Sequence, residues 1–238
     1  MSFKHGKNTK VLVNEFDVSS YFSDGSTSQS VETGETTAYG NSAKTYVVGL
    51  TDSTLSLSGF WDGSASAVDE ILSTALATDA EVITFAPEGL SAGSRINAMT
   101  SIGTSYEVSS PVADVVSTSF EAQTTDRLDR GISLCDLAAV TATGNGTAQD
   151  NSASTSNGGA ATLHVTANTR NGDTTFKVQH SADNSTWADL ITFSVVGSTT
   201  VTSERSTASG TVNRYVRVQH TLAGSTGSIT YHANFARR

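Results

Sequence analysis

The sequence predicts a mainly β protein: an N-terminal β-sandwich or barrel-like domain with one short α-helix and a long polar arm, followed by a small antiparallel β-sandwich. The first observation is composition, since the 238 residues include 35 serines, 35 threonines and 20 glycines but only two prolines. This composition is typical of many short strands with solvated outer faces. The second observation is that apolar and polar residues alternate in strand-sized clusters, whereas only one segment has helical spacing.

The N-terminal region begins with a hairpin, predicted from Val11–Val13 on one side and from Phe16 and Val18 on the other. The polar arm Ser23–Gly40 follows, and its residues cannot build a core. The next strand, Leu55–Trp61, alternates apolar and polar side chains. Long structureless loops are uncommon in compact domains and are usually functional. We therefore expect the arm to be disordered in a single copy and ordered by neighbouring subunits.

One α-helix is predicted over Ala67–Leu76, because its apolar residues fall on one face at helical spacing. Ser66 and Asp69 have the spacing of a capping box at its start. Strands are predicted after it at Glu81–Ala86 and over Gly93–Ser109, the latter as a long strand or as a hairpin with a break near Gly103. After a turn, residues 112–123 are predicted to run back along the preceding strand.

A charged segment follows these strands, with carboxylates and guanidinium groups close together in sequence: Asp126, Arg127, Asp129 and Arg130. Two interpretations are open. The four residues form a salt-bridged turn, or they contact another subunit.

A polar stretch at residues 141–159 predicts a flexible linker between a first domain, residues 1–140, and a second, residues 160–238. The second domain is expected to be an outward-facing, Ig-like or jelly-roll-like sandwich that is dispensable for assembly. Its regularly spaced strands are separated by turn residues. They are predicted at Ala161–Ala167, Thr174–His180, Leu190–Val196, Thr199–Glu204, Arg214–His220 and Ser228–Phe235.

Charge is divided unevenly along the chain. Residues 1–145 contain 7 Lys or Arg and 18 Asp or Glu, a net charge of −11, whereas residues 146–238 have a net charge of +2. The acidic part argues against nucleic-acid binding there. It suits a surface past which nucleic acid slides without sticking, although ordinary solubility charge is the alternative.

No catalytic or cofactor-binding constellation is found, so we expect neither an enzyme nor a cofactor. Serines are abundant, but none lies in a Gly-x-Ser-x-Gly motif, and Cys135 is expected to be a buried small hydrophobe. The histidines of the second domain lack metal-ligand spacing, although His180 and His220 could converge through strand pairing. We expect no metal. The chain shows no signal peptide and no apolar run long enough to span a membrane, which predicts assembly in a cytoplasm.

The segment Ser181–Trp187 has the pattern Ser-x-Asp-x-x-x-Trp, which resembles a turn common in carbohydrate-binding β-sandwich modules. Trp187 and Tyr215 are then candidates for weak stacking on a glycan. The alternative is that Asp183 forms a turn while Trp187 plugs the sandwich core.

Several runs resemble the major tail (tail tube) protein family of tailed bacteriophages. They are Gly6–Val13 with Val18–Phe22, Glu32–Gly40, Ala43–Leu50 and Leu57–Gly63, so the likeness covers roughly residues 3–134. The resemblance implies hexameric rings that stack into a conduit for genome delivery into the host cell. The appended sandwich favours a non-contractile, siphophage-like tail, because outward domains obstruct a sheath.

The resemblance also implies partners and a location. The partners are further copies of the chain, a tape measure protein, and tail terminator and distal tail proteins, with DNA passing transiently. The location is the virion, after assembly in the host cytoplasm. The arm would make the inter-subunit contacts, through Ser23, Asp24, Glu32, Glu35, Thr36, Tyr39 and Gly40. The alternatives are a virion or cell-surface adhesin that binds glycans and, more remotely, the tube of a bacterial secretion machine.

Overall fold

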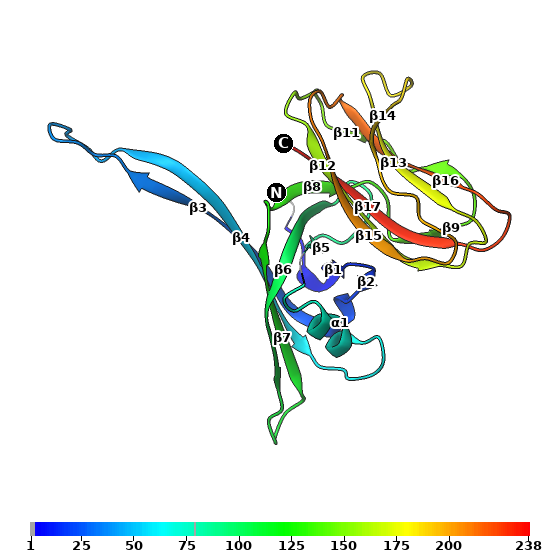
Figure 1. Ribbon diagram of the computed structural model, residues 1–238, viewed down its shortest axis with the longest axis horizontal. Coiled ribbons are helices and arrows are strands. Elements are labelled where there is room, and N and C mark those ends of the chain that lie inside the picture. Colours follow the sequence, from blue (N-terminus) through cyan, green and yellow to red (C-terminus); the bar gives the residue numbers. More distant parts are fainter. Residues whose placement is uncertain (1–2, 79) are drawn as a thin grey trace. The chain divides into compact units, whose positions relative to one another are not determined.

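The computed structural model describes residues 3–78 and 80–238 and is mainly β, as predicted (Figure 1). The chain forms two compact units, and neither is one continuous stretch. Unit 1 contains the described residues up to Ser20 together with Val82–Ala98 and Asp129–Arg238, and unit 2 contains Tyr21–Glu81 and Met99–Leu128. The units therefore do not follow the boundary that the sequence predicts within residues 141–159.

Unit 1 is a sandwich of two antiparallel sheets. The larger sheet has the order β15-β12-β17-β8-β6-β5-β1-β2, with β9 paired to β17, and the smaller has the order β10-β16-β13-β14, with β11 paired to β16. Across the residues described, the larger sheet has 12 strands, and those with residues in unit 1 are β1 (Lys10–Val13), β2 (Phe16–Asp17), β5 (Glu81–Ala86), β6 (Arg95–Ser109, up to Ala98), β8 (Asp129–Ser133), β9 (Ala138–Val140), β12 (Gly159–Asn168), β15 (Thr202–Ala208) and β17 (Ile229–Arg237). Those of the smaller are β10 (Gly144–Asn145), β11 (Gln149–Asp150), β13 (Thr174–Ser181), β14 (Ala188–Thr192) and β16 (Tyr215–Leu222).

The core of the sandwich lies between these two sheets. Alternate residues of β12 and β17 point into it, among them Leu163 and Phe235, and they meet Val178 and Val218 of the smaller sheet. Leu134 belongs to the same buried cluster, although it lies in the region that the sequence assigns to a separate first domain. All six strands predicted for residues 160–238 are present, with ends that differ by a few residues.

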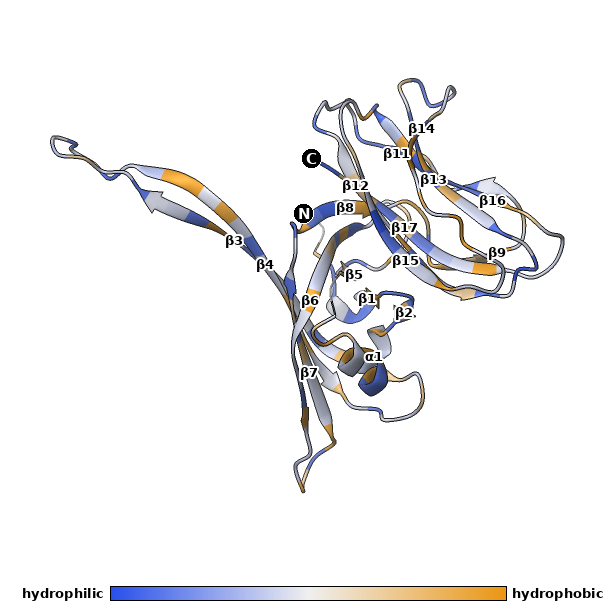
Figure 2. Ribbon diagram, in the orientation of Figure 1, coloured by the Kyte–Doolittle hydropathy of each residue, from blue (hydrophilic) through white to orange (hydrophobic). Residues whose placement is uncertain are grey.

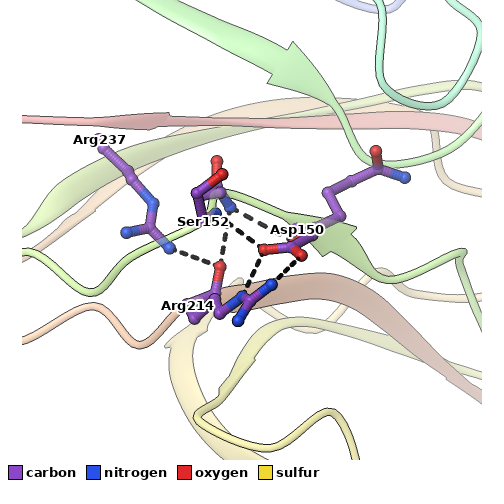
Figure 3. A network of polar contacts seen from close by, with 6 residues as sticks. Asp150, Ser152, Arg214 and Arg237 are labelled. Atoms are coloured by element: carbon purple, nitrogen blue, oxygen red, sulfur yellow. Dashed lines mark hydrogen bonds and ion pairs between the residues drawn. The ribbon is translucent and has the colours of Figure 1, made fainter.

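Residues 141–159 are not a flexible linker in this structure. They contain β10 and β11, which both pair with β16, and the first residue of β12. Figure 3 shows how Asp150 is held: its carboxylate accepts bonds from Nε and Nη2 of Arg214 at 2.7 and 2.6 Å. These bonds lower the pKa of Asp150 to about 2. Arg237 donates to the backbone carbonyl of Arg214, which ties the last strand to the same network.

The β12–β17 sheet face that points away from this core is also buried, but it is polar. His164 of β12 and His232 of β17 lie directly opposite each other and are fully buried. His164 bonds the hydroxyl of Thr84 through Nε2 at 2.8 Å and the carbonyl of Asn14 through Nδ1. Nδ1 of His232 donates to the carbonyl of Cys135 at 2.9 Å. Both rings are thus held in place by segments distant in sequence, His164 by Asn14 and Thr84 and His232 by Cys135.

This histidine pair predicts a loss of stability in mild acid. Burial lowers the pKa of His164 to about 4 and that of His232 to about 3, from an ordinary value near 6.5. Below pH ~6.5 the unfolded chain binds protons that the folded chain excludes. The free energy of unfolding is therefore highest above pH ~6.5 and falls by a few kcal/mol as the pH drops toward 4.

Urea unfolding between pH 7.5 and 4.5 measures this dependence. Replacing His232 by Gln should flatten the pH dependence in that window, whereas replacing the exposed His5 by Gln should leave it unchanged. An equally steep dependence in both variants would show that carboxylates rather than the histidine pair are responsible.

Unit 2 is a four-stranded antiparallel sheet with one helix. Its order is β3-β4-β7-β6, and its elements are β3 (Phe22–Glu35), β4 (Tyr46–Phe60), β7 (Ser117–Thr124), the part of β6 from Met99 onward and α1 (Val68–Thr74). The break predicted near Gly103 is a bulge in a single long strand. Gly103 is required there, because a Cβ would lie 2.6 Å from the carbonyl oxygen of Ala75, just after α1.

Helix α1 forms where the sequence predicts it, but its cap differs. The N-cap residue is Ala67, which makes no side-chain capping bond, so the predicted capping box of Ser66 and Asp69 is wrong. Asp69 is engaged elsewhere: its carboxylate accepts from Nε1 of Trp61 at 2.9 Å and from the hydroxyl of Tyr106 at 2.7 Å. These bonds lower the pKa of Asp69 and fix the helix to the sheet.

Candidate functional site

The arm is the most unusual feature of unit 2, and it is a β-hairpin. β3 and β4 pair from Phe22 with Gly59 out to Glu35 with Tyr46, so most of the predicted polar arm is strand. The expectation of a structureless arm is therefore corrected. Interstrand hydrogen bonds satisfy the backbone groups that lie between β3 and β4, and polar side chains suit an element with two solvated faces.

The arm residues predicted to contact other subunits divide between the strand and the hairpin end. Ser23, Asp24, Glu32 and Glu35 lie in β3, whereas Thr36, Tyr39 and Gly40 lie beyond it. The end is closed by local bonds. The amide of Thr36 donates to the carbonyl of Thr45 at 2.8 Å, and Nζ of Lys44 pairs with Glu35 at 3.0 Å.

The hairpin has unpaired edges. Among the described residues, β3 pairs only with β4, and β4 pairs with β7 only from Thr54 to Phe60. The outer edge of β3 and the edge of β4 from Tyr46 to Asp52 are therefore not paired with another strand. Such edges readily pair with a strand of another chain.

The projecting half of the hairpin also carries exposed apolar side chains, which we call the arm patch: Val31, Tyr46, Val47, Val48 and Leu50. Val48 and Leu50 are 75% and 77% exposed. Figure 2 shows this as a hydrophobic stretch along β4, away from the helix-covered part of the sheet. Consecutive residues of a strand point to opposite faces, so Val47 and Val48 expose apolar surface on both faces of the hairpin. Exposed apolar surface of this kind marks interaction sites.

The acidity predicted for the front of the chain is concentrated in unit 2. This unit contains 13 Asp and Glu residues but only two cations, Lys44 and Arg127, a net formal charge of −11. Unit 1 has the remaining 12 cations and 10 acidic residues, a net of +2. No Lys or Arg occurs in β3, β4 or β7. A polyanion would therefore find few favourable contacts on this sheet.

The structure separates the four residues of the predicted charged turn. Asp126, Arg127 and Arg130 are exposed, whereas the side chain of Asp129 is only 2% exposed. Its carboxylate accepts from Nε of Arg205 at 3.0 Å and from Nε of Arg238 at 3.3 Å. Asp129 therefore belongs to a buried ion-pair cluster inside unit 1. Because its side chain is buried there, the prediction that Asp129 contacts another subunit is wrong. The local sequence holds no sign of these two distant partners.

The predicted turn after β13 is present. Asp183 accepts from the amides of Thr186 and Ser185 at 2.8 and 2.9 Å, and these bonds hold the pKa of Asp183 well below its usual range. Trp187 is half-buried and is not one of the core residues, so the expectation that it plugs the core is wrong. The guanidinium carbon of Arg217 lies 4.1 Å from the centroid of its ring.

Tyr215, the second candidate for glycan contact, is covered in the same way. The guanidinium carbon of Arg214 lies 4.9 Å from the centroid of the Tyr215 ring. One face of each candidate aromatic is therefore already occupied by an arginine, which leaves less ring surface for stacking on a sugar.

His180, His220 and Cys135 belong to unit 1 and make contacts within it. His180 lies opposite Val216, and His220 lies opposite Phe176, so the two do not converge. In the described part of the chain, no three His, Cys, Asp or Glu residues gather closely enough to hold a metal ion. Cys135 packs against the sandwich core, and burial raises the pKa of its thiol to about 12. No helix among the described residues has the length and apolar character needed to cross a membrane.

The chain matches no protein-family profile and no curated protein. Among solved structures, it is similar to a protein in the virion of a native gene transfer agent, with a TM-score of 0.43 and 13% identity over 54% of this chain and 98% of that one. It is also similar to a protein in the baseplate of the anti-feeding prophage, with a TM-score of 0.40 and 15% identity over 54% of this chain and 97% of that one. The Dit protein of phage SPP1 is described as a hub of the adsorption apparatus. It matches with a TM-score of 0.39 and 12% identity over 97% of this chain and 100% of that one.

Proposed function

We propose that the chain is a structural subunit of a phage tail, and that its copies associate through the β3–β4 arm. One observation carries the proposal: a long hairpin projects from unit 2 with two unpaired edges and an exposed apolar patch. Burying a large apolar side chain contributes about 1.5–3 kcal/mol, and strand pairing adds backbone hydrogen bonds. An arm with both properties is suited to binding another copy of the chain.

The finer proposal is a tail tube protein whose hexameric rings stack into a conduit for DNA. It is supported by the sequence resemblance over residues 3–134 and by the acidity of unit 2. If unit 2 lines the conduit, its net charge of −11 keeps DNA from sticking during transit, because phosphate binding requires Lys or Arg. The resemblance further supports tape measure, terminator and distal tail proteins as partners, and a place in the virion after assembly in the host cytoplasm.

The glycan-binding adhesin receives less support, because arginines cover one face of both candidate aromatics, Trp187 and Tyr215. Weak glycan contact through Trp187 and Tyr215 stays a subordinate proposal. The pairing of β17 with β8 argues against a dispensable second domain, whereas its outward position stays part of the proposal.

Shortening the arm tests the proposed function. Gln29 and Ser53 are paired, so replacing residues 30–52 by Asn-Gly keeps the register and closes the hairpin with a two-residue turn. We expect this variant to keep the unfolding midpoint of the parent and to remain monomeric at concentrations at which the parent assembles. Sedimentation velocity and negative-stain microscopy measure the outcome.

A pair of matched charge variants separates the arm patch from general solubility. Replacing Val48 and Leu50 by Glu should weaken assembly at least tenfold in concentration. Replacing Val195 and Val201, two exposed valines of unit 1, by Glu adds the same charge elsewhere and should have little effect. Undiminished assembly of the shortened-arm protein would refute the proposal.

A further inference from the structure

Unit 2 carries a second exposed apolar surface, which we call the hairpin-end patch: Phe60, Val112 and Val115. Phe60 pairs with Ser117, and Ser117 pairs with Ser109, so the ends of β4, β7 and β6 lie in one row. The amide of Trp61 donates to the carbonyl of Val116, which places the tryptophan at the same end. Phe60 and Val115 are 52% and 59% exposed.

This patch borders a concavity of about 480 Å³ in unit 2, lined by Phe60, Val115 and neighbouring serines. Two exposed carboxylates, Glu107 and Asp114, also line it, and none of its lining residues is a cation. The concavity therefore combines apolar side chains with uncompensated negative charge. A fitting occupant would present apolar side chains next to a positive charge.

The arm patch has that combination. Lys44 is one of only two cations in unit 2, and it lies beside Tyr46, Val47 and Val48 at the end of the arm. Its side chain remains 66% exposed although it pairs with Glu35. A surface ion pair of this kind contributes little, so Lys44 can turn to other carboxylates at small cost.

The arm of the same copy does not reach this concavity. Tyr46 and Phe60 are the two ends of β4, and 15 residues of strand span roughly 45–50 Å. Figure 1 shows the end of the arm and the β6–β7 turn at opposite ends of unit 2. The two patches can therefore meet only between different copies.

We infer that the arm patch of one copy docks on the hairpin-end patch of a second copy, with Lys44 facing Glu107 and Asp114. This inference rests on the proposed function, because it names the surface that receives the arm. Two different patches form a heterologous contact, and repetition of such a contact gives a closed ring or an open stack. Association through paired arms, by contrast, would be isologous and would end at a dimer.

Cross-linking of two separately tagged proteins tests this arrangement. One carries Val48→Cys and the other Val115→Cys, and a short bismaleimide is added to the mixture after assembly. We expect the mixed product, which joins the two differently tagged proteins, to exceed either homodimer at least fivefold. Native Cys135 stays in both proteins, because it is partly buried and its thiol has a raised pKa. The matched control pairs Val48→Cys with Val195→Cys, an exposed valine of unit 1, and should give only background product.

Each other outcome overturns the inference in a distinguishable way. If the homodimer of the Val48→Cys protein dominates, or if Val195→Cys links as well as Val115→Cys, the chain assembles but the arm docks elsewhere. If sedimentation before cross-linking finds only monomers of the unmodified chain, the proposed function fails together with this inference. Lys44→Glu provides an independent readout, since it should weaken assembly more than Lys177→Glu does.

Discussion

A chain truncated after Leu137 is expected not to fold. It retains β1, β5, β6 and β8 but loses β17, β12 and β15, the three strands that follow β8 at one end of the larger sheet. β8 loses its pairing with Phe235, and Leu134 loses the whole core cluster to which it belongs. Thr84 loses its bonds to His164 and Asn234. These losses exceed the roughly 5–15 kcal/mol by which typical domains are stable.

Circular dichroism and thermal unfolding measure the effect, with the shortened-arm protein as the control for removal of residues as such. The truncated chain should lack a cooperative transition, and the shortened-arm chain should keep one. A truncated protein that folds cooperatively and polymerises would show that the first 137 residues are an independent tube domain, as the sequence alone suggests.

Replacing Asp129 by Asn should destabilise unit 1 by roughly 3–5 kcal/mol, because breaking a buried ion pair leaves an uncompensated charge. Arg205 is the group left behind, and its side chain is only 9% exposed. The amide of Asn has nearly the shape of the carboxylate, so a cavity does not contribute to the loss. Urea unfolding at pH 7.5 measures the change in the free energy of unfolding.

Asp126→Asn provides the matched control, since Asp126 is exposed and lies three residues earlier in the same segment. We expect a change within about 0.5 kcal/mol for this variant. Equal effects of the two substitutions would mean that the buried cluster around Asp129 contributes no more than a surface ion pair.

Local patterns predicted most of the elements. The strands of residues 160–238 and the helix near Ile71 were predictable, because side-chain alternation and helical spacing are properties of neighbouring residues. The arm hairpin was missed, since β3 holds only polar residues and glycine apart from Phe22 and Val31. A strand with two solvated faces has no alternation to detect.

The features that depend on distant partners could not be predicted. Asp126 and Asp129 look alike in sequence, and only Arg205 and Arg238, far along the chain, distinguish the exposed carboxylate from the buried one. The apparent linker is polar because its short strands cover β16 with few apolar side chains. The pairing of β17 with β8 joins segments about 100 residues apart, and no local spacing encodes it.

The order of strands in the chain has a consequence during protein synthesis. All of unit 2, including the arm, has been translated by Leu128, whereas β17 follows every strand with which it pairs. A growing chain on the ribosome can therefore extend the β3–β4 hairpin while the larger sheet of unit 1 is still open. If the arm binds other copies as proposed, neighbouring ribosomes on one message would hold several such hairpins close together, and the first encounter between copies would precede the completion of either one.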